Sequence, residues 1–247
     1  MISYQDLDVL KQRLDSFRPL PPEVVRNLHA DLVLRWTYHS NAIEDNTLTL
    51  KETKVVLEGI TVGGKSMREH LEAINHREAI LFMEELVAKN EPLSEWQIKS
   101  IHQLILKNID DKNAGVYRKI NVIISGAEHV PPDALRVQSD MENLIGWHQS
   151  QGAALHPVER AARLHADFVK IHPFVDDNGR TARLLMNLEL MKSGFPPVVL
   201  PVEKRLEYYE ALDNAHTKND YEPFLQLIIE MAVAGFEPYW HVLGVSK

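Results

Sequence analysis

The sequence predicts an all-α protein that carries one short β-hairpin. Apolar residues recur every three or four positions along most of the chain, which is the spacing of one face of a helix. Helix-capping boxes, in which Ser or Thr precedes Glu or Gln by three residues, occur at Thr49 and Ser94. Between residues 118 and 124 the apolar residues alternate instead, which is typical of a strand. The turn-forming pair Ser125 and Gly126 follows, so a hairpin is expected there.

Prolines, glycines and caps set the boundaries of the predicted helices. Pro157 stands where a proline begins a helix, and Gly59 and Gly194 stand where a glycine ends one. The predicted helices are, in order, one that follows Pro22, then 49–59, 66–89, 94–109, one that a further capping box opens at Ser139, then 157–172, 180–194, and two between 203 and 234 that divide near Asn219.

The composition excludes several classes of protein. The 247 residues are 45% hydrophobic and 25% charged, as in ordinary soluble domains. A net charge of -8 argues against binding to nucleic acid, and the absence of cysteine excludes disulfides, thiolate metal sites and cysteine nucleophiles. The N-terminus is charged and no apolar run approaches the length of a membrane helix. A cytoplasmic protein without nucleic-acid or membrane partners is expected.

The densest cluster of polar residues joins two predicted helices in the second half of the chain. The first turn of a helix offers free backbone N–H groups and partial positive charge, which favour an anion such as phosphate. Gly179 lets a ligand approach the backbone, and Arg180 and Arg183 share one side of the helix. Asp176 offers a hard oxygen ligand for Mg²⁺, and His172 can accept a proton from a hydroxyl group. This combination predicts transfer of a phosphorus-containing group.

The run His-Pro-Phe-Val-Asp-Asp-Asn-Gly-Arg-Thr-Ala-Arg at 172–183 resembles the Fic family signature HPFx(D/E)GNGRxxR. Enzymes of this family typically move AMP from ATP onto a Ser, Thr or Tyr hydroxyl of a target protein, with Mg²⁺. The resemblance implies an all-α Fic-type bundle with a small β-hairpin flap at about 115–132 near the active site. It divides the chain into an N-terminal helical extension (1–60), a Fic core (61–200) and C-terminal helices that complete the same domain (201–247).

The resemblance also implies a role for each residue of the signature. The implied roles are general base for His172, Mg²⁺ ligand for Asp176, phosphate contacts for Asn178, Gly179 and Arg180, γ-phosphate anchor for Arg183, and a core plug that fixes the loop for Phe174. Asp177 departs from the family pattern, which has glycine there. Because Asp tolerates unusual backbone angles, the loop shape is expected to survive. The Asp177 carboxylate would either oppose phosphate or give Mg²⁺ a second ligand.

A second resemblance lies upstream, at residues 40–46. The sequence Ser-Asn-Ala-Ile-Glu-Asp-Asn is similar to the inhibitory motif (S/T)xxxE(G/N) of one class of Fic proteins, with Asp45 as the departure. The motif implies that Glu44 pairs with Arg183 and so occupies the guanidinium that the γ-phosphate needs. Without the Fic signature, the same residues would indicate a helix cap at Ser40 and a solvated charge at Glu44.

The predicted hairpin suggests how a target protein binds. Ile120, Val122 and Ile124 lie on one side of the predicted strand and Ile123 lies on the other. The edge of such a hairpin can pair with an extended segment of a target protein, although a structural loop that covers the site explains the pattern equally well. The expected partners are ATP and a target bound at the flap. Self-modification is expected as well, and a homo-oligomer is left open.

Three alternatives remain at this point. Asp177 could prevent turnover and leave a nucleotide-binding regulatory module. The enzyme could also remove AMP from modified targets, with Glu44 positioning a water molecule. The third alternative is a metal-dependent phosphohydrolase, in which His165 and His172, seven residues apart on one helix face, bind a metal together with Asp176 or Asp177.

Overall fold

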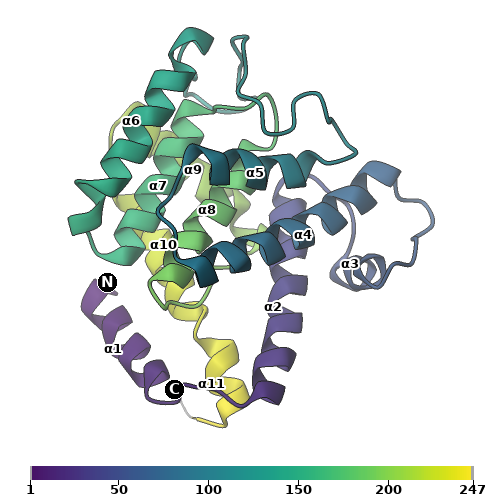
Figure 1. Ribbon diagram of the computed structural model, residues 1–247, viewed down its shortest axis with the longest axis vertical. Coiled ribbons are helices and arrows are strands. Elements are labelled where there is room, and N and C mark those ends of the chain that lie inside the picture. The colour runs from purple at the N-terminus through teal and green to yellow at the C-terminus, as the bar shows by residue number, and fades with distance from the viewer. Residues whose placement is uncertain (1, 246–247) are drawn as a thin grey trace.

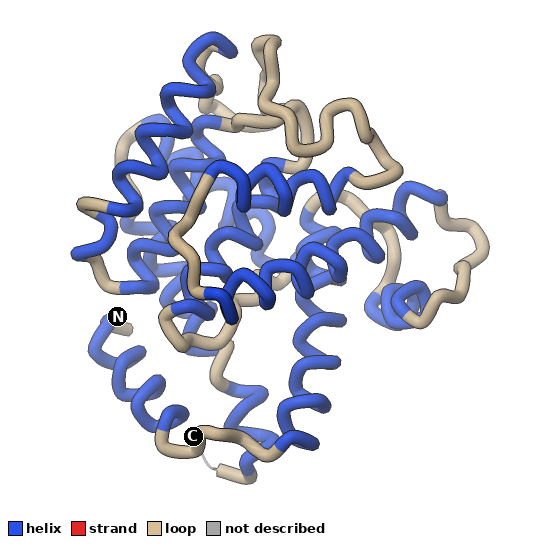
Figure 2. Tube along the Cα trace, in the orientation of Figure 1, coloured by secondary structure: helices blue, strands red, loops and turns tan. Residues whose placement is uncertain are grey.

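The computed structural model describes residues 2–245, and within this range it contains eleven α-helices and no strand (Figures 1 and 2). The α-helices are α1 (Tyr4–Asp15), α2 (Pro22–Ile43), α3 (Leu50–Leu57), α4 (Met67–Lys89), α5 (Glu95–Leu106), α6 (Val137–Gln149), α7 (Pro157–Ile171), α8 (Asn178–Lys192), α9 (Arg205–Thr217), α10 (Glu222–Ala234) and α11 (Glu237–Leu243). Three short 3₁₀ helices, η1 (Ala134–Arg136), η2 (Gly152–Ala154) and η3 (Val202–Lys204), precede α6, α7 and α9. None of the described helices is long and apolar enough to cross a membrane.

Most of the expected helix starts are confirmed. Complete capping boxes begin α3 at Thr49 and α5 at Ser94, and Pro157 is the first residue of α7. The capping box expected at Ser139 is wrong, because α6 already begins at Val137. There the short helix η1 runs directly into α6, so Ser139 lies inside the first turn and its hydroxyl donates to a backbone carbonyl three residues earlier. A preceding 3₁₀ turn thus replaces the side-chain cap.

Helix α8 occupies the middle of the bundle and determines where the active-site loop lies (Figure 1). Twelve of its fifteen residues are buried, and it packs against α2, α4, α5 and α7. A helix that is buried all round presents apolar residues on every side. Leu185 and Leu188 face the apolar cluster formed with α4, α5 and α6, whereas Met186 and Leu190 face a second cluster formed with α1, α7 and α10. Helix α8 is therefore packed between two apolar cores, which fix the position of the whole helix.

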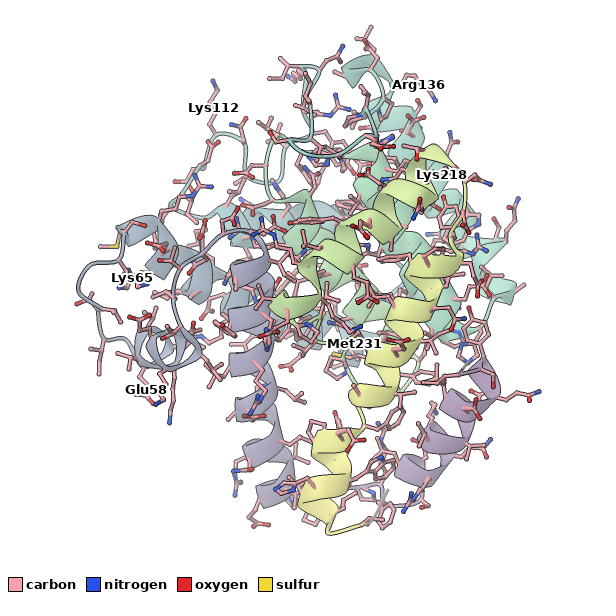
Figure 3. All side chains as sticks on the ribbon, turned by 180° about the vertical axis from the view of Figure 1, so that it is seen from behind. Glu58, Lys65, Lys112, Arg136, Lys218 and Met231 are labelled. Atoms are coloured by element: carbon pink, nitrogen blue, oxygen red, sulfur yellow. The ribbon has the colours of Figure 1, made fainter. Side chains whose placement is uncertain are left out.

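The predicted β-hairpin flap is not a hairpin. Residues 115–132, called the flap below, form an extended loop without paired strands (Figure 2), and Lys112 and Arg136, which bracket it, lie at the same end of the molecule (Figure 3). Its two arms are joined by side chains, because Asn121 donates to Asp133 and accepts from the Ala134 N–H. These bonds replace the backbone ladder that the alternating pattern predicted.

Candidate active site

Two residues in the left-handed backbone region and one side-chain clamp shape the loop between α7 and α8. His172 ends α7 at φ 51°, and Asp177 precedes α8 at φ 61°. The Asn178 side chain accepts a hydrogen bond from the Phe174 N–H and donates one to the Phe174 carbonyl, both at 2.9 Å. Phe174 is fully buried and stacks on the ring of His102 with 3.5 Å between centroids. The loop is therefore formed without help from a ligand.

Asn178 and Gly179 can offer a phosphate only their backbone. The amide of Asn178 is used inside the loop, so the phosphate contact implied for this residue has to come from its N–H. The first N–H groups of a helix have no partner within the helix. A Cβ on Gly179 would lie 2.5 Å from Oε1 of Glu44 and 3.1 Å from a guanidinium nitrogen of Arg183, so no larger residue fits without displacing Glu44.

The ion pair expected between Glu44 and Arg183 is present, although the two residues are 139 positions apart in the sequence. Nη2 of Arg183 donates to Oε1 of Glu44 at 2.8 Å and to the carbonyl of Ser40 at 2.9 Å, and Nε donates to the Ser40 hydroxyl at 3.1 Å. The Arg183 side chain is 3% exposed and that of Glu44 is 30% exposed. Burial alone would lower the pKa of Arg183, but Glu44 and Tyr208 together outweigh it and raise the pKa, so the guanidinium stays charged.

Arg180 is also buried and is also surrounded by carboxylates. Its Nη2 contacts the carboxylate of Asp177, and its Nη1 donates to Oδ1 of Asn41 at 3.1 Å and lies 3.4 Å from Oε1 of Glu72. The side chain of Arg180 is only 4% exposed, and that of Asp177 is 1% exposed. Burial, together with the negative charges of Asp176, Glu44 and Glu72, raises the pKa of Asp177 to about 6 despite the nearby Arg180.

Asp176 is the carboxylate that faces solvent. Its side chain is 55% exposed, accepts from the Asp177 N–H at 2.8 Å and from Arg68 at 3.0 Å, and borders a cavity of about 300 Å³ together with Glu44 and Arg180. Burial tends to raise the pKa of Asp176, but the Asp177 N–H and Arg68 outweigh it and lower the pKa. Mg²⁺ in nucleotide sites usually takes one or two carboxylates and the substrate phosphates. An accessible, ionised carboxylate beside the buried Arg180 fits that pattern.

His172 borders a larger cavity of about 550 Å³ on the other side of Glu44. Burial and the nearby charge of Arg118 lower the pKa of His172 to about 4, and the charge of Glu44 opposes this shift only in part. The imidazole is therefore neutral near pH 7 and has a nitrogen lone pair that can accept a proton. Glu44 and Gly179 border the same cavity, so the His172 imidazole and the N-terminus of α8 share one space.

The flap contributes one of its four predicted contact residues to this cavity. Ile124 borders it, together with residues 125–127. Ile120 and Ile123 are exposed by 61% and 86%, and Val122 is partly buried but does not border the cavity. The apolar residues of the flap therefore do not form the single face that the alternating pattern predicted.

The comparisons with known proteins agree with the signature. A family model described as the Fic/DOC family matches residues 92–190. The protein adenylyltransferase fic-1 of Caenorhabditis elegans is 38% identical over 227 residues, which are 90% of this chain and 44% of the relative. A solved structure of part of Fic-1 from C. elegans matches with a TM-score of 0.88 and 34% identity, covering 98% of this chain and 72% of that chain. This chain belongs to the Fic/DOC family.

The Fic fold extends over the whole described chain. A Fic domain containing signaling protein from Bacteroides thetaiotaomicron matches with a TM-score of 0.86 and 28% identity, covering 99% of this chain and 98% of that chain. The all-helical Fic fold expected from the resemblance is thereby confirmed. The Fic chain described here spans about half the length of the curated relatives it matches.

Two contacts of the Fic site were not singled out from the sequence. The Tyr208 hydroxyl lies between Nη1 of Arg183 (3.4 Å) and Nε2 of His165 (3.0 Å), so it helps to hold the Arg183 guanidinium in position. Arg118 is 3% exposed and donates to the carbonyls of His172 (2.8 Å), Ile120 (2.9 Å) and Pro132 (2.5 Å). Neither residue lies in a motif, so no sequence signal could have identified them.

The metal-dependent phosphohydrolase alternative loses its geometric basis. His165 is fully buried and its Nε2 is hydrogen-bonded with Tyr208, so it faces the core and not the His172 cavity. Burial lowers the pKa of His165 well below its usual value. Within residues 2–245, no three His, Cys, Asp or Glu side chains are arranged to hold a metal ion by themselves.

Proposed function

We propose that this Fic protein is a protein adenylyltransferase that Glu44 holds in an inhibited state. It transfers AMP from ATP to a Ser, Thr or Tyr hydroxyl of a target protein. Relatives that are 34–38% identical are named protein adenylyltransferases, which supports this chemistry. The observation that carries the proposal is the position of the Glu44 carboxylate. It accepts a hydrogen bond from Arg183 at 2.8 Å and fills the space next to Gly179 that a Cβ would need. It occupies the place where the α8 N-terminus would hold an anion.

The transfer needs one base and several cationic or N–H groups. The neutral imidazole of His172 accepts the proton of the target hydroxyl while the hydroxyl oxygen forms a bond to the α-phosphorus of ATP. The bond between that phosphorus and the bridging oxygen breaks, and pyrophosphate leaves with the electron pair. The backbone N–H groups at the start of α8 bind α-phosphate oxygens, and Arg180 and Arg183 bind the leaving phosphates.

Asp176 is the residue that would hold Mg²⁺ in this reaction. When bound, the ion supplies positive charge that neutralises the phosphates of ATP. Asp176 now pairs with Arg68, whose side chain is 55% exposed, so this arginine can turn away without leaving a buried charge behind. The carboxylate is then free to face the phosphates from the 300 Å³ cavity.

Inhibition follows from competition for a limited number of donors. Arg183 already uses Nη2 for Glu44 and Ser40, and Nε for the Ser40 hydroxyl. The γ-phosphate has to displace Glu44 before it can reach this guanidinium. Exposed ion pairs contribute only about 0–1 kcal/mol, but a partner as buried as Arg183 is screened far less from its carboxylate. ATP therefore binds with its α-phosphate out of line for attack.

The target protein binds on the flap side of the His172 cavity. Residues 121–123 lie in no helix or strand and no backbone ladder pairs them, so their backbone can bind an extended segment of a target. Self-modification is the same reaction with a segment of another copy of the chain as the target. Removal of AMP is a second activity of this site, because Glu44 and His172 border one cavity. There Glu44 can position a water molecule whose oxygen attacks the phosphorus, so that the bond to the side-chain oxygen breaks and AMP and the free hydroxyl are released.

The test is self-modification of the wild type and the Glu44→Gly variant with labelled ATP and Mg²⁺. Removal of the competing carboxylate should raise AMP transfer at least about tenfold, which requires only about 1.4 kcal/mol. Glu58→Gly is the matched control, since Glu58 ends α3 as Glu44 ends α2, but it is exposed and pairs only with Lys54 at 4.0 Å. The control should leave the rate unchanged.

The second half of the test concerns the released arginine. Arg183→Ala in the Glu44→Gly background should return transfer toward the wild-type rate, because Arg183 is the group that Glu44 had occupied. Equal transfer by the wild type and Glu44→Gly, with ATP bound by both, would remove the inhibitory role. A complete absence of transfer in Glu44→Gly would instead favour the nucleotide-binding regulatory module. Loss of label from modified protein, followed in the wild type, tests the removal of AMP.

A further inference from the structure

Asp177 is a side chain where the backbone favours glycine. Its φ of 61° lies in the left-handed region, and it is 6% exposed. A backbone outlier that survives at a functional site points to a role for the side chain. The Asp177 side chain makes no capping hydrogen bond to α8, which is the usual use of Asp at this position. Its carboxylate lies on Nη2 of Arg180 instead.

The two arginines of the signature are therefore occupied in parallel ways. Arg183 is held by Glu44, which comes from α2, and Arg180 is held by Asp177, which lies three residues before it. A guanidinium has five N–H donors and no acceptor. On Arg180, Nη2 faces Asp177 and Nη1 faces Asn41 and Glu72, so both terminal nitrogens are already in use. Nε of Arg180 has no partner but is buried, so a phosphate that approaches the terminal nitrogens competes with these groups.

Among the groups on Arg180, Asp177 is the carboxylate with the fewest other partners. Glu72 also accepts from Arg68 at 3.0 Å and from Asn46 at 2.8 Å, which hold it in place independently of Arg180. The two Asp177 carboxylate oxygens are buried and make no well-formed hydrogen bond, so the contact with Arg180 is their main interaction. Asp177 also lies next to the first N–H groups of α8, the place where phosphate arrives.

We propose that Asp177 sets the nucleotide affinity of this Fic protein because its carboxylate competes with phosphate for Arg180. It is thus a second competing carboxylate, in addition to Glu44, which occupies Arg183. The inference rests on the proposed function for the identity of the ligand, a nucleoside triphosphate. Asp177 acts through Arg180 and is thus a positioning residue, not a catalytic one. Release of Glu44 alone leaves Arg180 occupied, so the Glu44→Gly variant still binds nucleotide below the affinity that the site can reach.

The alternative role for Asp177, a second Mg²⁺ ligand, fits the geometry less well. Asp176 borders the 300 Å³ cavity and is 55% exposed, whereas the Asp177 side chain is 1% exposed and does not border that cavity. A metal ligand has to present its oxygens to the ion. The two roles also differ in sign, because loss of a metal ligand weakens binding of the nucleotide with Mg²⁺, whereas loss of a competitor strengthens it.

The experiment measures binding of a non-hydrolysable ATP analogue by calorimetry, with Mg²⁺ and with EDTA, in the Glu44→Gly background. Asp177→Gly and Asp177→Asn should each lower Kd at least fivefold, and the gain should persist in EDTA. Asn keeps the shape of Asp and tolerates the left-handed backbone, so it separates the charge from the backbone. In AMP transfer the same variants should lower KM while kcat stays within about twofold. Thermal unfolding verifies that each variant is folded.

Three results would overturn the proposal. An unchanged Kd in both variants would show that Arg180 is not in competition. A gain in Asp177→Gly alone would assign the effect to the backbone. Weaker binding that occurs only with Mg²⁺ would make Asp177 a metal ligand. Because analogue binding does not depend on transfer, a Glu44→Gly protein without AMP transfer would refute the proposed function and still leave this measurement decisive.

Discussion

The segment 40–46 and the flap border the same cavity, but they are held in opposite ways. In the segment 40–46, Ser40, Asn41 and Glu44 each accept hydrogen bonds from a buried arginine of α8. The two ends of the flap are held by buried Arg118 and Tyr117 and by His129, whereas its apolar side chains at 120 and 123 are exposed to solvent. We call the side with Arg180 and Arg183, which acceptors of the chain itself occupy, the closed side, and the exposed middle of the flap the open side; under the proposed function they bind the nucleotide and the target, respectively.

Electrostatics explains the closed side. A buried guanidinium without a partner is very costly, so Arg180 and Arg183 need anions or acceptors whether or not a nucleotide is bound. The protein supplies these from its own chain, and the nucleotide has to exchange with them. The middle of the flap leaves Ile120 and Ile123 exposed, so few buried contacts hold this part and its conformation can adapt to a target. We therefore expect substitutions on the two sides to change different quantities.

The largest expected effect comes from His172, which lies between the two sides. In the Glu44→Gly background, His172→Ala should reduce AMP transfer by about 10²–10⁴-fold, the usual range for a positioned base. ATP affinity should change by less than about twofold, because the imidazole does not hold the phosphates. Transfer rates from labelled ATP and calorimetric affinities provide the two measurements. Retained transfer in this variant would contradict the assignment of the base and place the decisive group elsewhere.

The closed side was largely predictable from the sequence. The signature residues lie close together in the chain, and the caps and glycines that shape their loop act over a few residues. The contact between Glu44 and Arg183 spans 139 positions and was expected only because two short motifs were interpreted together. The contact between Asp177 and Arg180 has the i,i+3 spacing of a local pair, but the burial of both side chains, which makes the contact matter, depends on the tertiary packing.

The open side was predictable only in its position. The alternation at Ile120, Val122 and Ile124 is a strand pattern. A strand needs a second strand to pair with, however, and the sequence does not show that this second strand is absent. Arg118 and Asn121 instead bind carbonyls and side chains across the loop. Tertiary contacts of this kind override a propensity that short-range patterns report correctly.

A smaller effect is expected from Arg118, which connects the two sides. Lys in its place cannot reach three separate carbonyls, because an ammonium lacks the planar fork of the guanidinium. Arg118→Lys in the Glu44→Gly background should lower self-modification about tenfold through a misplaced flap, which corresponds to about 1.4 kcal/mol. Nucleotide affinity should stay within about twofold. A parallel loss of nucleotide affinity would show that the flap also shapes the closed side.

The smallest effect is expected at the tip of the open side. Ile123 is 86% exposed and does not border the cavity, so its replacement removes no packing from the protein. If the flap binds the target through its exposed apolar residues, Ile123→Ser in the Glu44→Gly background should lower self-modification about threefold. The reason is that an exposed apolar side chain contributes binding energy only when a partner covers it. Val9→Ser is a matched control, since Val9 is 63% exposed on α1 and does not border the cavity. An equal loss in both variants would show that apolar exposure in general, and not the flap, determines how the target binds.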